Sequence, residues 1–134
     1  MTNISKVYLV DDDEINNFIC TNILKKINFS DNVVAYESGT EALEALKAAL
    51  TNNQEDVPDV IFLDINMPIM NGWDFLEEFK AIKGQINKTI SLFMLSSSIY
   101  QADVEKSKQY EEVVDFVTKP LNADVLNDIK QKYF

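Results

Sequence analysis

The run Val60–Asp64 (VIFLD) is apolar at every position except the last, which is an aspartate. A strand with one face in water alternates apolar and polar residues, whereas an unbroken apolar run indicates burial on both faces. Strands buried on both faces are typical of parallel sheets that helices cover on each side. The run therefore predicts an α/β fold in which Asp64 ends a fully buried strand.

Strands and helices alternate outward from this run to both ends of the chain. Further strands are expected at about residues 6–10, 32–38, 89–95 and 113–117. Apolar residues recur at helical spacing in the segments between and after them, which predicts helices at about 14–28, 38–53, 73–82, 99–109 and 122–134. This alternation predicts a single domain over residues 1–134, with a five-stranded parallel sheet, five flanking helices and no output domain.

Helical periodicity also predicts how the helices begin and which side chains face the sheet. The second helix is expected to begin at the Gly39-Thr40 pair, and the last is expected to be capped by Asn122. The inward residues of the first helix are predicted to be Ile19, Cys20, Ile23, Leu24 and Ile27. Those of the second are Ala42, Leu43, Leu46 and Leu50, and those of the last are Val125, Leu126 and Ile129.

The composition argues against several classes of function. The net charge of −10 argues against binding to nucleic acid, whose phosphates attract lysine and arginine. No apolar run suits a membrane span or a signal peptide, and the single cysteine, Cys20, cannot form an internal disulfide. We therefore expect a cytoplasmic protein. The chain has no histidine, which removes Ser-His-Asp catalysis and most zinc sites, so any phosphohistidine must belong to another protein.

Polar side chains follow four of the predicted strands at the points where these strands end. They are Asp11-Asp12, Asp64, Ser96–Ser98 and Thr118-Lys119-Pro120. Because the carboxyl ends of parallel strands share one edge of the sheet, and ligands bind there, we expect these side chains to converge. Asp13 and Glu14 are expected to lie apart from them, in the first turn of the next helix, where its macrodipole favours acids.

Clustered carboxylates with a hydroxyl and an ammonium suit a hard cation and a phosphoryl group. Mg²⁺ takes oxygen ligands, and a bound cation offsets the repulsion between neighbouring carboxylates. Asp64 could then form an aspartyl-phosphate, while Lys119 and the Ser96 hydroxyl contact the phosphoryl oxygens. The three glycines are scattered and form no nucleotide-binding loop, so side chains and metal must hold the phosphoryl group.

Four segments resemble the receiver domain of two-component response regulators, and the resemblance covers nearly the whole chain. They are VYLVDDDEINN (7–17), IFLDINMPIMNGWDFL (61–76), MLSSS (94–98) and DFVTKPL (115–121). The resemblance implies a flavodoxin-like, doubly wound sheet with strand order 2-1-3-4-5. It also implies a stand-alone, chemotaxis-regulator-like signalling protein that is not an enzyme acting on a separate substrate.

The resemblance further implies a role for each matching residue. Asp64 would be the phosphoacceptor, with Ser96 and Lys119 holding the phosphoryl group. Mg²⁺ would be bound directly by Asp12, Asp64 and the backbone carbonyl of Asn66, with Asp11 acting mainly through water. Ser96 and Phe116 would switch the face made by the fourth helix, fifth strand and fifth helix, and Pro120 would be structural, often after a cis peptide bond.

The implied partners are a histidine kinase or histidine phosphotransfer protein as donor and a downstream protein effector or relay. The protein would be a monomer or a phosphorylation-dependent dimer, without nucleic-acid binding or membrane insertion. Two alternatives stay open. One is a receiver-like binding module that is never phosphorylated. The other is a small phosphatase with an aspartyl-phosphate intermediate, for which Asp11 and Asp13 offer the required Asp-x-Asp spacing.

Overall fold

The computed structural model describes residues 4–97 and 100–134, which form five strands and five α-helices. The strands are β1 (Val7–Val10), β2 (Val33–Tyr36), β3 (Val60–Asp64), β4 (Ser91–Ser96) and β5 (Val113–Thr118). The α-helices are α1 (Glu14–Lys26), α2 (Gly39–Asn52), α3 (Gly72–Ile82), α4 (Gln101–Ser107) and α5 (Ala123–Tyr133). Single 3-10 turns follow α2 at Gln54–Asp56 and α3 at Lys83–Gln85.

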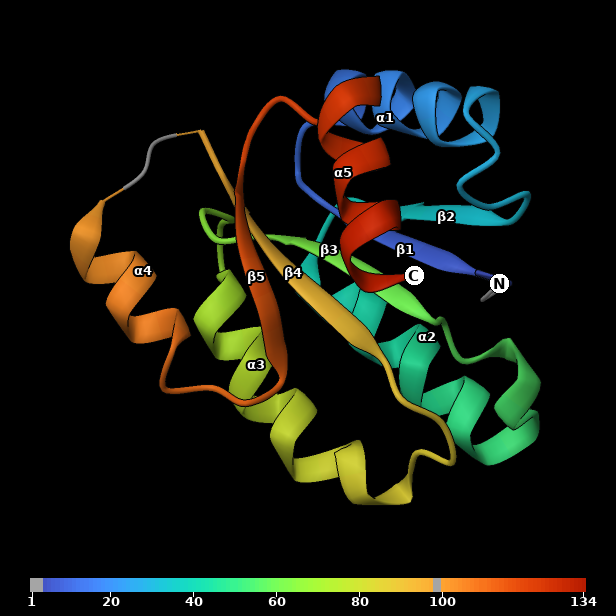
Figure 1. Cartoon of the computed structure of the whole chain (residues 1–134). Helices are drawn as coiled ribbons and strands as arrows, with labels where there is room; N and C mark the ends of the chain where they lie inside the picture. The colour runs from blue at the N-terminus through green and yellow to red at the C-terminus, as the bar shows by residue number, and fades with distance from the viewer. Residues whose placement is uncertain (1–3, 98–99) are drawn as a thin grey trace.

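All five strands are parallel and lie in the order β2-β1-β3-β4-β5, with β3 in the middle. Helices α1 and α5 cover one face of the sheet, α2 and α3 cover the other, and α4 lies beside the β5 edge (Figure 1). The predicted flavodoxin-like, doubly wound fold and its strand order are thus confirmed. The carboxyl ends of β1 and β3 lie next to each other, because these two strands pair directly.

Strand β3 is buried over its whole length, as the unbroken apolar run predicts. Ile61 and Leu63 pack into the cluster beneath α2 and α3, whereas Val60 and Phe62 pack into the cluster beneath α1 and α5. Each fully buried side chain of this size contributes roughly 1.5–3 kcal/mol through the hydrophobic effect. The strand that ends in Asp64 is therefore anchored on both faces, which holds the aspartate in a fixed place.

Helix α1 departs from the predicted pattern of burial. Its buried residues are Asn17, Cys20 and Leu24, while Ile19, which was expected to face the sheet, is 50% exposed. Asn17 can turn inward because its side-chain amide donates to the backbone carbonyl of Asp11 at 2.8 Å. With a polar residue on the inner face, three apolar residues, Ile15, Phe18 and Ile19, are left on the outer face.

The helix caps agree with the sequence in one case and differ in another. Asn122 caps α5 by accepting from the Val125 N–H, as expected. The cap of α2 is Ser38, not the Gly39-Thr40 pair, because a serine oxygen in extended backbone can accept from the Glu41 N–H.

Helix α4 is shorter than predicted and begins at Gln101. Ser98, expected to follow the fourth strand, and Ile99, expected to begin the fourth helix, lie outside the described residues. Among the residues that the structure describes, no helix is both long and apolar enough to span a membrane.

Candidate functional site

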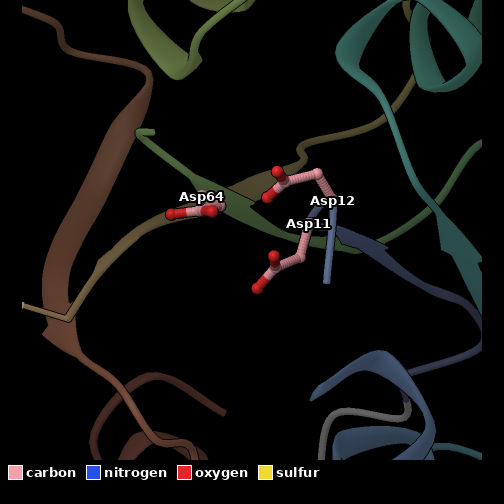
Figure 2. A group of neighbouring side chains, drawn as sticks. All are labelled: Asp11, Asp12 and Asp64. Atoms are coloured by element: carbon pink, nitrogen blue, oxygen red, sulfur yellow. The ribbon is translucent and has the colours of Figure 1, made fainter. Parts of the chain in front are cut away.

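Three carboxylates gather at the carboxyl edge of the sheet, as the strand ends predict. Ligand oxygens of Asp11, Asp12 and Asp64 all lie within 4.8 Å of one another (Figure 2). They come together because Val10 of β1 pairs with Leu63 of β3, so the residues that follow each occupy neighbouring positions. Three oxygen donors this close suit a hard divalent cation, whose charge would offset their repulsion. The predicted metal-binding side chains are therefore in one place.

The three carboxylates differ in their access to water. Asp11 and Asp64 are only 2% and 4% exposed, whereas Asp12 is exposed. Burial and the negative charge of Asp11 raise the pKa of Asp64 to about 6, although Lys119 opposes the shift. Near neutral pH, Asp64 is therefore mainly a charged carboxylate at the floor of the site, while Asp12 borders the solvent.

Lys119 bridges the two buried carboxylates. Its Nζ lies 2.6 Å from Oδ2 of Asp11 and 3.3 Å from Oδ2 of Asp64. Burial lowers the pKa of Lys119, but its hydrogen bonds and ion pairs with both aspartates outweigh this and raise it, so the ammonium stays charged. The Lys119 backbone is fixed by an N–H that donates to the Ser96 carbonyl at 2.8 Å, and the peptide bond to Pro120 is cis.

Asp11 is held by residues that sequence reasoning did not assign to the site. Its Oδ1 accepts from the Asp13 N–H at 2.9 Å, and its Oδ2 accepts from the Asn16 side-chain amide at 2.9 Å. Asn17 holds its backbone carbonyl. The signal for these contacts is the Asn16-Asn17 pair, because Asn17 occupies a position where helical periodicity places an apolar side chain. Asp13 itself caps α1, as expected for an acid outside the site.

The predicted switch residues lie on β4 and β5, beside Lys119. Ser96 ends β4 and is 1% exposed, and it pairs in register with Thr118 of β5. Phe116 lies on β5 opposite Met94 and is partly buried against the cluster beneath α2 and α3. The structure therefore brings Ser96 to the edge of the sheet that carries the site. It puts Phe116 on the face of the sheet that α2 and α3 cover.

The loop between β3 and α3 folds back onto Asp64. The N–H of Asn66, which is itself exposed, lies 3.4 Å from Oδ1 of Asp64, and the N–H of Gly72 donates to the Ile65 carbonyl at 2.8 Å. Ile69 at the loop tip is fully exposed and has a positive φ of 67°. This placement keeps the Asn66 backbone close to the three carboxylates; its carbonyl as a metal ligand stays a prediction.

The arrangement offers a buried carboxylate nucleophile, a neighbouring ammonium, a strand-end hydroxyl and oxygen ligands for a cation. Such groups can neutralise the charge of a phosphoryl group and hold it against the attacking oxygen.

Comparison with protein families gives a match over most of the chain. The family described as "Response regulator receiver domain" matches residues 7–131. The chemotaxis protein CheY of Bacillus subtilis is 32% identical, in a match that covers 89% of this chain and 88% of that protein. The histidine kinase CKI1 of Arabidopsis thaliana is 28% identical, over 95% of this chain but only 12% of the kinase. The chain thus spans a small part of some relatives and nearly all of another.

Solved structures agree in fold. A two-component response regulator from Cytophaga hutchinsonii is 32% identical, with a TM-score of 0.87 and coverage of 98% of this chain and 97% of that one. The receiver domain of CKI1, complexed with Mg²⁺ and BeF₃⁻, is 27% identical with a TM-score of 0.80, and the match covers 96% of this chain and 91% of that one.

Proposed function

Because this chain belongs to the response regulator receiver domain family, we propose that it is a signalling switch whose Asp64 accepts a phosphoryl group from a partner phosphohistidine. The observation that carries the proposal is the position of the Asp64 carboxylate, 3.3 Å from Lys119 Nζ and beside two further aspartates. On this proposal the protein turns over no separate substrate.

The donor set fits Mg²⁺ as the resident cation. Asp12 and Asp64 would bind it directly, together with the Asn66 carbonyl, and Asp11 would act through water. When bound, the metal would supply positive charge to the phosphoryl oxygens. The protein relies on oxygen ligands alone here, which suits Mg²⁺ better than a softer metal.

The side chains divide the work of the transfer between them. A carboxylate oxygen of Asp64 forms a bond to phosphorus while the bond between phosphorus and the donor's imidazole nitrogen breaks. The electron pair of that bond stays on the imidazole, which takes up a proton from water. Lys119 pairs with one phosphoryl oxygen and the Ser96 hydroxyl donates to another, so charge is neutralised where it gathers.

We place the donor's docking surface on the outer face of α1, next to the site. Ile15, Phe18 and Ile19 are 72%, 69% and 50% exposed, and α1 begins directly after the aspartate pair. A hollow of about 370 Å³ beside Phe18 is bordered by acids that include Glu37 and Glu41. A donor with an apolar and basic helix face would fit this surface, whereas a second copy of this acidic chain would be repelled.

The output would pass through the face formed by α4, β5 and α5, with Ser96 and Phe116 as the moving parts. The receiver would act in the cytoplasm on a protein effector or relay the phosphoryl group onward, as a monomer or a phosphorylation-dependent dimer. The phosphatase alternative is disfavoured by Asp13, whose carboxylate accepts the Ile15 and Asn16 N–H groups and so does not point to the site as a second catalytic acid.

Labelling with acetyl phosphate tests the proposal. Intact-mass measurement should show one labile phosphoryl adduct in the presence of Mg²⁺ and none in EDTA. Asp64→Asn should abolish the adduct, while Asp31→Asn, a change of an exposed aspartate outside the site, should leave it intact. An unlabelled wild-type protein would favour the unphosphorylated binding module, and rapid turnover of phosphoesters would favour the phosphatase.

A further inference from the structure

One carboxylate oxygen of Asp11 accepts from two side chains, a charged ammonium and a neutral amide. Its Oδ2 accepts from the Lys119 ammonium at 2.6 Å and from the Asn16 amide at 2.9 Å. Its Oδ1 accepts from the Asp13 N–H at 2.9 Å. With Asp11 only 2% exposed, these three donors take the place of water around a buried charge.

Lys119 is closer to Asp11 than to the residue that would carry the phosphoryl group. Its Nζ lies 2.6 Å from Asp11 but 3.3 Å from Asp64. An ammonium that turns toward phosphoryl oxygens on Asp64 must loosen its contact with Asp11. A buried carboxylate that loses its cation is costly unless other donors satisfy it.

We infer that Asn16 is a positioning residue that keeps Asp11 satisfied and in place while Lys119 turns to the phosphoryl group. The inference rests on the proposed function and assigns a role to a residue whose side-chain amide contacts Asp11. Asn16 acts indirectly. Its hydrogen bond to Asp11 allows Lys119 to move from Asp11 toward the phosphoryl group.

The geometry around Asn16 suits this role, because three hydrogen bonds close a ring. The Asp13 N–H donates to Asp11, the Asp13 carboxylate accepts from the Asn16 N–H at 3.1 Å, and the Asn16 amide returns to Asp11. The ring fixes the first turn of α1 against the acid pair. Only the Asn16 amide in it reaches the oxygen that Lys119 also contacts.

The chemistry of an amide also fits better than the alternatives. A lysine or arginine at position 16 would add a second cation beside Asp11 and oppose the binding of a divalent ion. An aspartate would add a negative charge and could not donate. A neutral donor satisfies Asp11 and leaves the net charge of the metal site unchanged.

Phosphorylation kinetics test the role directly. Asn16→Leu removes the donor at similar size and should lower the maximal rate of labelling by acetyl phosphate, at saturating Mg²⁺, by at least about fivefold. The half-saturating acetyl phosphate concentration should change little, because the proposed role of Asn16 is to hold Asp11 and not to bind the phosphodonor. Asn16→Gln, which retains an amide, should recover part of the rate, and Asn22→Leu, on an exposed asparagine of α1, should behave as wild type.

A metal-free measurement separates this role from simple packing. In EDTA, Asn16→Leu should lower the folding equilibrium constant more in a Lys119→Met background than in wild type, by at least about threefold. In that background Asn16 is the one side-chain donor to Asp11 that the structure gives among the residues it describes. Asn22→Leu should have the same effect in both backgrounds. Urea unfolding of the four proteins of each cycle gives these values.

The outcomes are distinct. A wild-type protein that takes up no phosphoryl group would overturn the proposed function, and the role of Asn16 in transfer with it. A wild type that is labelled, with Asn16→Leu equally fast or with no coupling to Lys119 in EDTA, would overturn the role of Asn16 alone.

Discussion

Gly72 lies against the backbone of Asp64, so closely that a β-carbon on it would be 2.9 Å from the Asp64 carbonyl oxygen. The same β-carbon would lie 2.9 Å from Cα of Ile65 and 3.0 Å from the Met94 methyl. Two of these neighbours are backbone atoms of the strand end that carries the site. The loop after β3 can therefore reach its position only with a glycine here.

Gly72→Ala is expected to destabilise the protein by about 1–3 kcal/mol, because the β3 backbone must shift to make room. The same shift should lower the rate of phosphoryl uptake at Asp64. Gly84→Ala is the matched control, since a β-carbon placed there would have no atom of the other described residues within 4 Å, its two chain neighbours aside. Urea unfolding and acetyl phosphate labelling check both variants, and equal stabilities for the two would contradict the close contact seen at Gly72.

A second prediction concerns the pH dependence of the metal-free protein. The pKa of Asp64 is raised to about 6 by burial and by Asp11, from 3.8 in an unperturbed carboxyl. Between these pH values the folded protein binds a proton that the unfolded chain has released, so stability falls as pH rises from about 4 to about 6. The expected loss from this one group is about 3 kcal/mol.

Asp64→Asn removes the titrating group and should flatten this part of the stability curve. In EDTA near neutral pH the variant should be more stable than the wild type, because it carries no charge against Asp11. Urea unfolding across the pH range checks this, with Asp31→Asn as the control. Parallel curves for wild type and Asp64→Asn would show that burial of Asp64 does not perturb its ionisation.

The main features of this site could be predicted because they depend on the strands. Val60–Asp64 reads as a buried strand from its composition, and the pairing of parallel strands then brings Asp11 and Asp64 to one edge. What could not be predicted depends on individual hydrogen bonds. Asn17 turns inward because it satisfies the Asp11 carbonyl, and this displaces Ile19 from the face that periodicity assigns to it.

The contact between Asn16 and Asp11 could not be predicted from the sequence either. The two residues are five positions apart in the sequence, and only the sharp entry of the chain into α1, capped by Asp13, brings the amide back to the carboxylate. An asparagine in a first helical turn is otherwise typical of a solvated position. The sequence shows which residues end the strands. The hydrogen bonds that hold those residues in place can be seen only once the path of the backbone is known.

A third prediction separates the donor's docking surface from the chemistry. Phe18→Ala removes an aromatic side chain that is 69% exposed and makes no contribution to the core. Transfer from a phosphohistidine protein should slow by about tenfold or more, the usual effect of losing an aromatic anchor. Labelling by acetyl phosphate, which needs no docking surface, should be unchanged.

Val114→Ala provides the control, because Val114 is also exposed but lies on β5, away from α1. Transfer rates measured with a partner kinase or phosphotransfer protein check the prediction. Equal slowing with both phosphodonors would place the effect of Phe18 on the site itself and contradict a docking role.

The last prediction concerns how α4 is held. The rings of Trp73, at the start of α3, and Tyr110, before β5, stack with centroids 5.9 Å apart and planes 25° apart. Lys106 of α4 places its ammonium 4.8 Å from the Trp73 ring centre. Because Ser107 is the only buried residue in α4, this aromatic contact should be a main tie between that helix and the rest of the fold.

Tyr110→Ala should therefore loosen α4 without unfolding the sheet. Amides of α4 should exchange with deuterium at least about threefold faster, since an aromatic pair is worth roughly 0.5–1.5 kcal/mol beyond its buried area, while those of β1 and β3 keep their rates. Tyr100→Ala, a change of a tyrosine that is 62% exposed at the other end of α4, should leave exchange nearly unchanged. Trp73 is the only tryptophan, so its fluorescence reports on the same contact. If phosphorylation moves α4, beryllofluoride with Mg²⁺ should alter the Trp73 fluorescence of the wild type. An identical exchange pattern in Tyr110→Ala would show that α4 is held by its other contacts and not by the stacked rings.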